Sequence, residues 1–153
     1  MRKLLIAVAC LIIFNNGNAF AAFIISGESA CCGSGVVYSY KFSEYASFPD
    51  STVKISEYAS FSDITMKLVD DSRQADLIFA DGIENAEMKI CKSNSSFGVK
   101  TIKVSKYAPF PDLTVKLSKY SSFSDYKIFI ASKIFTIEEV AALFAVILKT
   151  NKK

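Results

Sequence analysis

Short stretches of alternating hydrophobic and polar residues recur along this chain roughly every 13 residues. Successive side chains of a β-strand point to opposite faces, so this alternation predicts short strands with one buried face. The apolar pairs expected on the buried face are Val53/Ile55, Met66/Leu68, Ile102/Val104, Val115/Leu117 and Ile128/Ile130. The residues expected on the opposite face, where lysines contact solvent, are Lys54, Lys67, Lys103, Lys116 and Phe129.

A second pattern fills the intervals between the predicted strands. Residues 45–63 read YASFPDSTVKISEYASFSD, and residues 107–125 read YAPFPDLTVKLSKYSSFSD, identical at 14 of 19 positions. Ser, Pro and Asp suit a tight corner in which side-chain oxygens accept hydrogen bonds from nearby backbone N–H groups. We therefore expect one Asp per corner to bond the backbone of its own corner. These repeat-corner residues are Asp50, Asp63, Asp76, Asp112 and Asp125.

Strand and corner together form a unit of about 13 residues, and about seven units fit the chain. The regular units are Lys41–Val53, Lys54–Met66, Lys67–Phe79, Lys103–Val115 and Lys116–Ile128, with two altered units between them. The pattern predicts a compact, mainly β domain over residues 36–150. Its C-terminal part differs: Thr136 and Glu139 form a capping box, which predicts a helix over 136–149. This helix is apolar nearly all round, so we expect it to be buried against the sheet.

The first 21 residues have the features of a secretory signal peptide. Arg2 and Lys3 precede an apolar run, Leu4–Phe14, and Ala19-Phe20-Ala21 fits a cleavage site. The run of eleven residues is shorter than the roughly 20 that a membrane span requires. We expect an exported protein, periplasmic or secreted, without a membrane span after processing.

Export makes a disulfide the expected state of the cysteines. Cys31, Cys32 and Cys91 remain once the signal peptide is removed, and Cys91 is expected to pair with Cys31 or Cys32. The third thiol then stays free or pairs between molecules. Residues 22–35, rich in Ser, Gly and Ala, are expected to form a flexible leader that is held only by such a bridge.

Composition gives little support for catalysis. The chain has no His, and the mature part carries 16 basic and 15 acidic residues, a net charge of +1, which does not indicate a nucleic-acid partner. No cofactor or metal site is expected. The favoured function is a structural or binding module without catalysis. The alternative is a carboxylate-dependent hydrolase or a Ca²⁺-binding surface protein that uses the repeated Asp row.

Each corner also contributes aromatic residues. Exposed tyrosines could bind protein or glycan, and these are Tyr45, Tyr58, Tyr107 and Tyr120. The corner phenylalanines are Phe48, Phe61, Phe110 and Phe123. We expect the phenylalanines to belong to the core and the tyrosines to be half-exposed.

The repeated Ser/Lys-x-Tyr-x-Ser-x-x-Asp-apolar pattern, with Lys-apolar residues between its copies, resembles the septoil-knot family of small bacterial proteins. Ser72–Leu77, SRQADL, is nearest to the family's recurring S-Q-A-D-L unit. The resemblance covers residues 36–148 and implies a mainly β domain whose backbone forms a seven-crossing knot, with no assigned activity. Without it, stacked strands and corners would predict a small β-solenoid, in which each unit contacts only its neighbours.

Overall fold

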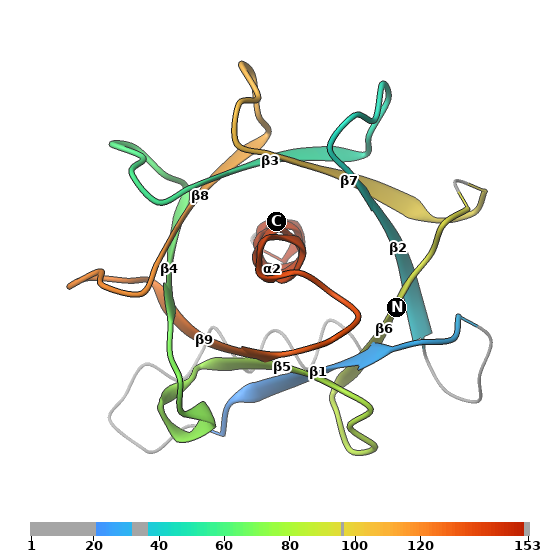
Figure 1. Ribbon diagram of the computed structural model, residues 1–153, viewed down its shortest axis with the longest axis horizontal. Coiled ribbons are helices and arrows are strands. Elements are labelled where there is room, and N and C mark those ends of the chain that lie inside the picture. Colours follow the sequence, from blue (N-terminus) through green and yellow to red (C-terminus); the bar gives the residue numbers. More distant parts are fainter. Residues whose placement is uncertain (1–20, 32–36, 96, 152–153) are drawn as a thin grey trace.

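The computed structural model describes residues 21–31, 37–95 and 97–151, which form nine β-strands and a C-terminal helix (Figure 1). The strands are β1 (Phe23–Glu28), β2 (Val37–Ser43), β3 (Ser51–Ser56), β4 (Ile64–Leu68), β5 (Leu77–Asp81), β6 (Met88–Lys92), β7 (Lys100–Ser105), β8 (Leu113–Ser118) and β9 (Tyr126–Ala131). A short 3₁₀ helix, η1 (Ser72–Gln74), precedes β5, and the α-helix is α2 (Ile137–Thr150).

The strands form a closed barrel in which every pair is parallel. The strand order around the barrel is β1-β5-β9-β4-β8-β3-β7-β2-β6. Strands that follow each other in the sequence are therefore never neighbours in the barrel, because each lies two positions from the one before it. Eight such steps pass almost twice around the nine positions, and the second winding fills the gaps left by the first. The mainly β prediction is confirmed. A solenoid is excluded because strands pair with partners four or five strands away in sequence.

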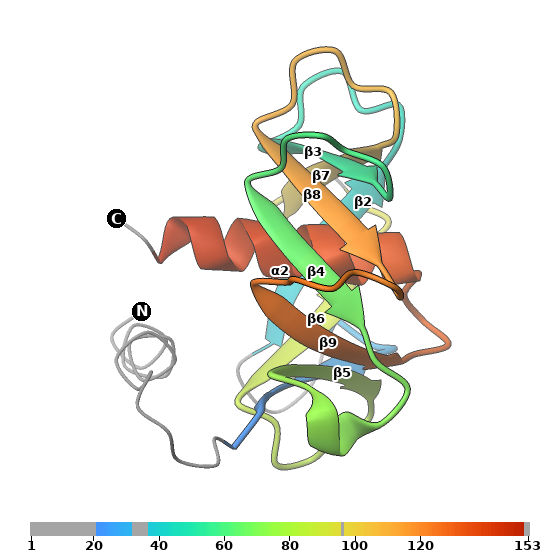
Figure 2. The same cartoon turned by 90° about the vertical axis from the view of Figure 1, so that its left-hand side faces the viewer.

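The barrel is filled by α2, which Figure 1 shows end-on at the centre and Figure 2 shows from the side. Val53, Met66 and Ile102 are among the predicted inward residues, and each is buried against the helix core. The helix residues Val140–Ala145 are almost fully buried. A helix that is apolar all round is stable here because the barrel wall surrounds it. The helix was predicted to be buried against the sheet, and the closed barrel buries it on all sides rather than on one.

The start of α2 is fixed by polar contacts. The Glu139 backbone N–H donates to Thr136 Oγ1 at 3.2 Å, and the Thr136 N–H donates to Glu139 Oε2 at 3.0 Å, which confirms the predicted capping box. Lys92, at the end of β6, places its Nζ 2.7 Å from Glu139 Oε1. This ion pair ties the first turn of the helix to the barrel wall.

The predicted leader over 22–35 is wrong for its first part. Residues 23–28 form β1, which pairs with β5 on one side and β6 on the other and closes the barrel. Ile25 in β1 is fully buried. The strand was missed because FIISGE is a single short segment outside the repeat.

Beyond β1, the sulfurs of Cys31 and Cys91 lie at disulfide distance, with their Cα atoms 5.2 Å apart. This confirms the predicted Cys91 bridge and selects Cys31 as its partner. Cys32 and residues 1–20 of the predicted signal peptide lie outside the described residues.

Candidate functional site

The described links between strands lie outside the barrel, and each crosses one strand of the other winding. The link from β2 to β3, residues 44–50, passes over β7, because β7 lies between β2 and β3 in the barrel. The same relation holds for the later links, which project outward as loops around the barrel (Figure 1). The corners predicted from the sequence are therefore crossing points between distant parts of the chain.

A carboxylate holds most of these crossings by a pair of hydrogen bonds. At the end of loop 44–50, the Asp50 N–H donates to the Thr101 carbonyl at 2.9 Å. The Thr101 N–H in turn donates to Asp50 Oδ2 at 2.7 Å. We call this arrangement a crossing clamp. It recurs at Asp63–Thr114, Asp76–Lys127, Asp112–Thr52 and Asp125–Thr65, with carboxylate distances of 2.7 Å.

The prediction that each Asp bonds its own corner is thus wrong, although all five aspartates do lie at equivalent corners. Each Asp bonds a residue 51 or 60 positions away, on the strand that its loop crosses. The backbone N–H of that residue lies just before the first pair of the strand ladder and therefore has no strand partner. The Asp carboxylate accepts its hydrogen bond instead. Glu87 makes the same pair with Ile24, at 2.8 and 3.0 Å, and sequence reasoning missed it. The position of Glu87 in the sequence could have identified it, because Glu87 directly precedes β6, as each Asp directly precedes its strand.

The clamp carboxylates lie at separate crossings and do not gather in one site. Each of the five aspartates accepts a backbone N–H from a different strand position, and none lines the groove described below. Within the described residues, no cluster of three or more His, Cys, Asp or Glu side chains could hold a metal ion. Over the same residues, no helix has the length and apolar character needed to cross a membrane.

The loops also carry the most exposed large hydrophobic side chains of the described protein. The tip phenylalanines are 89–97% exposed, and the tyrosines that precede four of them are 84–85% exposed. The phenylalanines are Phe48, Phe61, Phe97, Phe110 and Phe123, and the tyrosines are Tyr45, Tyr58, Tyr107 and Tyr120. The expectations that the phenylalanines belong to the core and that the tyrosines are half-exposed are both wrong. The strands and α2 already fill the interior, so the corner residues project outward.

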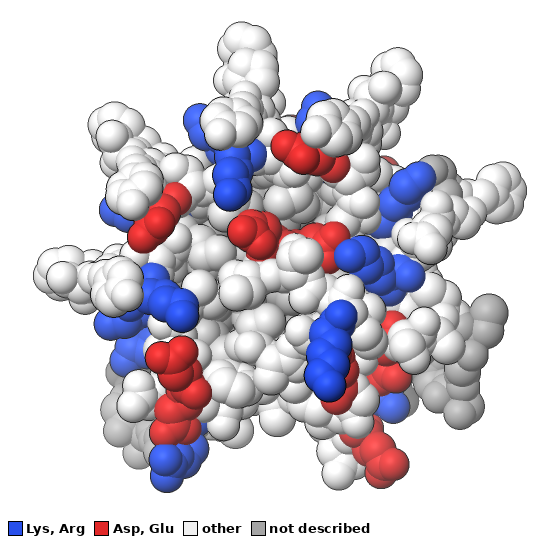
Figure 3. Space-filling model, viewed as in Figure 1, with Lys and Arg blue, Asp and Glu red and all other residues white. Residues whose placement is uncertain are grey.

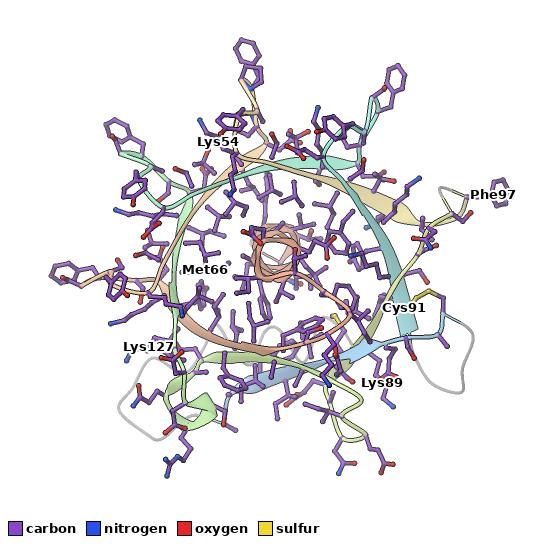
Figure 4. All side chains as sticks on the ribbon, viewed as in Figure 1. Lys54, Met66, Lys89, Cys91, Phe97 and Lys127 are labelled. Carbon is purple, nitrogen blue, oxygen red and sulfur yellow. A yellow bond between two sulfur atoms is a disulfide. The ribbon has the colours of Figure 1, made fainter. Side chains whose placement is uncertain are left out.

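These aromatic loops are neighbours in space. They cross β2, β7, β3, β8 and β4, which are consecutive strands of the barrel. We call the five loops the aromatic rim; they are residues 93–99, 44–50, 106–112, 57–63 and 119–125. Figure 3 shows them as uncharged projections over one side of the molecule, and Figure 4 shows Phe97 at the tip of its loop, pointing away from the barrel. The side chains that generate this rim come from two interleaved windings.

The remaining loops have different chemistry. Loop 69–76 carries Asp70, Asp71 and Arg73, and loop 82–87 carries Glu84 and Glu87. Arg73 Nη2 lies 2.8 Å from Asp71 Oδ2, and this guanidinium holds the pKa of the Asp71 carboxyl below its usual value. The barrel circumference therefore has an aromatic part and a charged part.

Four of the five rim loops are held at both ends. At the start of four of them, the Tyr backbone N–H donates to the hydroxyl of the Ser two residues earlier, at 3.1–3.3 Å. The crossing clamp holds the other end in the same four loops. These contacts fix short loops on a rigid barrel, so the aromatic tips keep a defined spacing.

An open groove of about 770 Å³ lies between two neighbouring rim loops, 57–63 and 119–125. Tyr58 and Tyr120 line it from the two loops, and Thr65 and Lys116 line it from the barrel wall. Thr65 and Lys116 are register partners in β4 and β8. Lys116 belongs to the lysine row that was predicted to be solvated, and it is half-buried in this groove.

Charge alternates along the rim. The residue before the Tyr is Glu in the first winding (Glu44, Glu57) and Lys in the second (Lys106, Lys119), and all four are exposed. Because loops of the two windings alternate around the barrel, the order becomes Glu44, Lys106, Glu57, Lys119. Neighbouring rim loops thus present opposite charges beside their aromatic residues.

No family model, curated protein or solved structure matches this chain.

Proposed function

We propose that this protein is an exported, non-catalytic binding module whose working surface is the aromatic rim. The observation that carries the proposal is the placement of nine aromatic side chains, all more than four-fifths exposed, on five neighbouring loops. Clusters of exposed aromatic residues are typical of interaction sites, where Tyr and Phe are enriched. Loops held at both ends lose little conformational freedom on binding, which favours affinity.

The form of the rim indicates what kind of partner can use it. The loops radiate from the barrel in different directions (Figure 1), so a flat surface contacts only a few tips at once. A protein or a glycan can instead enter between neighbouring loops. The groove between Tyr58 and Tyr120 offers aromatic rings together with hydroxyl groups, a lysine and a glutamate, which suit either class.

The alternative function, a hydrolase or Ca²⁺-binding protein that uses the Asp row, has less support. Each carboxylate already accepts a backbone N–H at 2.7 Å at its own crossing. A glycosidase requires two carboxylates about 5–10 Å apart on either side of one bond. The clamp residues instead follow the loops around the barrel.

The proposal also includes export of the protein and a knotted backbone. A bridge between Cys31 and Cys91 suits an oxidising compartment. The septoil-knot resemblance implies a knot and a repeat of about seven units. The two interleaved windings, with links that cross outside other strands, support the knot. Stretching the reduced chain by its two ends tests the knot. A knotted chain stops short of the roughly 3.3–3.6 Å per residue that an open chain reaches.

A matched pair of variants tests the rim. The rim variant replaces Phe48, Phe61, Phe110 and Phe123 by Ser. The control variant replaces Asp70, Arg73, Glu84 and Asn85 by Ser, an equal number of substitutions on the charged loops. Each mature protein is immobilised and exposed to the exported protein fraction and to a glycan array. We expect retention of specific partners by the wild type and the control, and loss by the rim variant. Equal binding by all three proteins contradicts the proposal.

A further inference from the structure

The residues that line the groove between loops 57–63 and 119–125 distinguish between the two classes of partner that could enter it. Three of them are aromatic, Tyr58, Tyr120 and Phe123, and none is aliphatic. Five of the nine lining residues are Lys, Glu or Ser, which are depleted where two proteins bury their surfaces against each other. The lining therefore favours a ligand rich in hydroxyl groups over the apolar side chains of a protein partner.

The polar lining offers both hydrogen-bond donors and acceptors. The Lys116 ammonium group only donates, the Glu57 carboxylate only accepts, and the Ser122 hydroxyl can do either. Lys116 and Glu57 form no hydrogen bond or ion pair with any described residue, so both remain available to a ligand. A sugar ring carries several hydroxyl groups, each of which donates and accepts, and it matches such a mixed set.

The aromatic residues suit the less polar face of a sugar. An aromatic ring has a partially negative face, which attracts the partially positive C–H groups on one face of a pyranose ring. Tyr58 and Tyr120 are 85% and 84% exposed, so a ligand can reach their rings from solvent. Their backbone N–H groups donate to the hydroxyls of Ser56 and Ser118, which fixes the start of each loop. Rings on loops fixed in this way lose little conformational freedom when a sugar binds.

The barrel sets the width of the groove. Thr65 and Lys116 line it from neighbouring strands, where they are register partners. Thr65 is also the residue that the Asp125 clamp holds, so the end of loop 119–125 is hydrogen-bonded to the base of the groove. The volume of about 770 Å³ lies within the range of about 300–1,000 Å³ that is typical of small-ligand sites. The open outer side leaves room for a sugar chain to continue beyond the groove.

The charges of the groove indicate which kind of sugar fits it. Lys116 and Glu57 are the charged residues among those that line it, and their charges cancel. None of the five clamp aspartates is among the lining residues. A groove without net charge gives no advantage to an acidic polysaccharide over a neutral one.

We propose that this groove binds a neutral oligosaccharide, with a sugar ring stacked against Tyr58 and Tyr120 and its hydroxyl groups hydrogen-bonded to Lys116 and Glu57. The inference rests on the proposed function of the rim and names the class of its partner. It differs from that function in requiring one particular groove rather than the rim as a whole.

A pair of double variants tests the aromatic contacts. The groove variant carries Tyr58→Ala and Tyr120→Ala. The control carries Tyr45→Ala and Tyr107→Ala, which remove two equally exposed tyrosines with the same Ser–Tyr backbone contacts from rim loops that do not line this groove. The backbone N–H groups of all four positions are retained, and circular dichroism verifies the fold.

A second pair of variants tests the polar contacts. Lys116→Met removes the ammonium group and keeps a long side chain. Lys103→Met is its control, because Lys103 belongs to the same lysine row, is also half-buried and does not line the groove.

The probes are neutral oligosaccharides of glucose, mannose, galactose and N-acetylglucosamine, with oligogalacturonate as an acidic comparison. Saturation-transfer NMR detects binding to the mature protein with its disulfide intact, and titration gives the dissociation constant. We expect the wild type to bind a neutral oligosaccharide with little dependence on salt. The groove variant should bind it about tenfold more weakly, and Lys116→Met should bind it several-fold more weakly. Both controls should bind as the wild type does.

Three outcomes overturn the inference. The first is a wild type that binds none of the neutral oligosaccharides, and the second is binding of oligogalacturonate alone, weakened by salt. The third is an equal effect of the groove variants and their controls. In each case, retention of exported proteins that the Phe→Ser rim variant loses would still support the rim as the working surface. Failure of both experiments would remove the proposed function as well.

Discussion

Removal of one carboxylate from a crossing clamp should lower the free energy of unfolding by the contribution of the lost hydrogen bond. In the Asp63→Ala variant, the Thr114 N–H loses its 2.7 Å bond to Oδ2, while the backbone bond from the residue 63 N–H to the Thr114 carbonyl at 2.8 Å can remain. A hydrogen bond to a charged group contributes about 1.5–3 kcal/mol. Asp63 is exposed, so water replaces part of the loss and the lower end of that range applies.

We therefore expect Asp63→Ala to lower the free energy of unfolding by about 1.5 kcal/mol, the low end of the range for a charged partner. Asp63→Asn keeps an oxygen acceptor but loses the charge, and it should cost about half as much, because charge-assisted bonds are roughly twice as strong as neutral ones. Phe61→Ser is the control in the same loop, and its effect should stay within about 0.5 kcal/mol.

Urea denaturation with a common m-value measures all three variants. If refolding is too slow for equilibrium, unfolding rates give the same ranking. A loss for Asp63→Ala no larger than that of the Phe61→Ser control would refute the clamp. An equal loss for Asn and Ala would show that the carboxylate charge is irrelevant. A rise in melting temperature on addition of Ca²⁺, abolished by Asp63→Asn, would favour the calcium-binding alternative.

Four further predictions concern other parts of the chain. Intact mass of the exported protein should give an N-terminus at Ala22, and retention of residues 1–21 would contradict the signal peptide. Cys91→Ser should lower the free energy of unfolding by about 4 kcal/mol, because the bridge spans 60 residues; non-reducing peptide maps that show free Cys91 in the exported protein would contradict it. Gly27→Ala should cost about 1–3 kcal/mol in thermal melts, since a Cβ would lie 2.6 Å from Asp81 Oδ1; an unchanged melting temperature would be inconsistent with this packing. Thr136→Ala should cost about 1 kcal/mol through loss of the helix cap, and Thr136→Ser should restore most of it.

Local features were predictable from the sequence. Val53 and Ile55 alternate with polar residues, and this period of two correctly assigned the buried strand face. Thr136 and Glu139 stand three residues apart before an apolar run, and this spacing correctly located the start of the helix. Both patterns depend on residues near each other in the chain.

The barrel and its site depend on contacts between distant residues, which the repeat could not specify. Identical units give no indication of which strand pairs with which, so Asp50 was assigned to its own corner rather than to Thr101. The exposure of Phe61 follows from the same cause. A hydrophobic corner residue is expected in the core unless the interior is known to be occupied by a helix.

Site-specific photo-crosslinking in the native exported setting tests most directly whether the rim is the working surface. The photoreactive amino acid p-benzoyl-phenylalanine is placed at position 61 on the rim or, as a control, at position 73 on the charged loops, and the adducts are identified by mass spectrometry. We predict specific adducts from position 61 and none from position 73. Adducts confined to position 73, or no adduct from position 61, would contradict the rim as the binding surface.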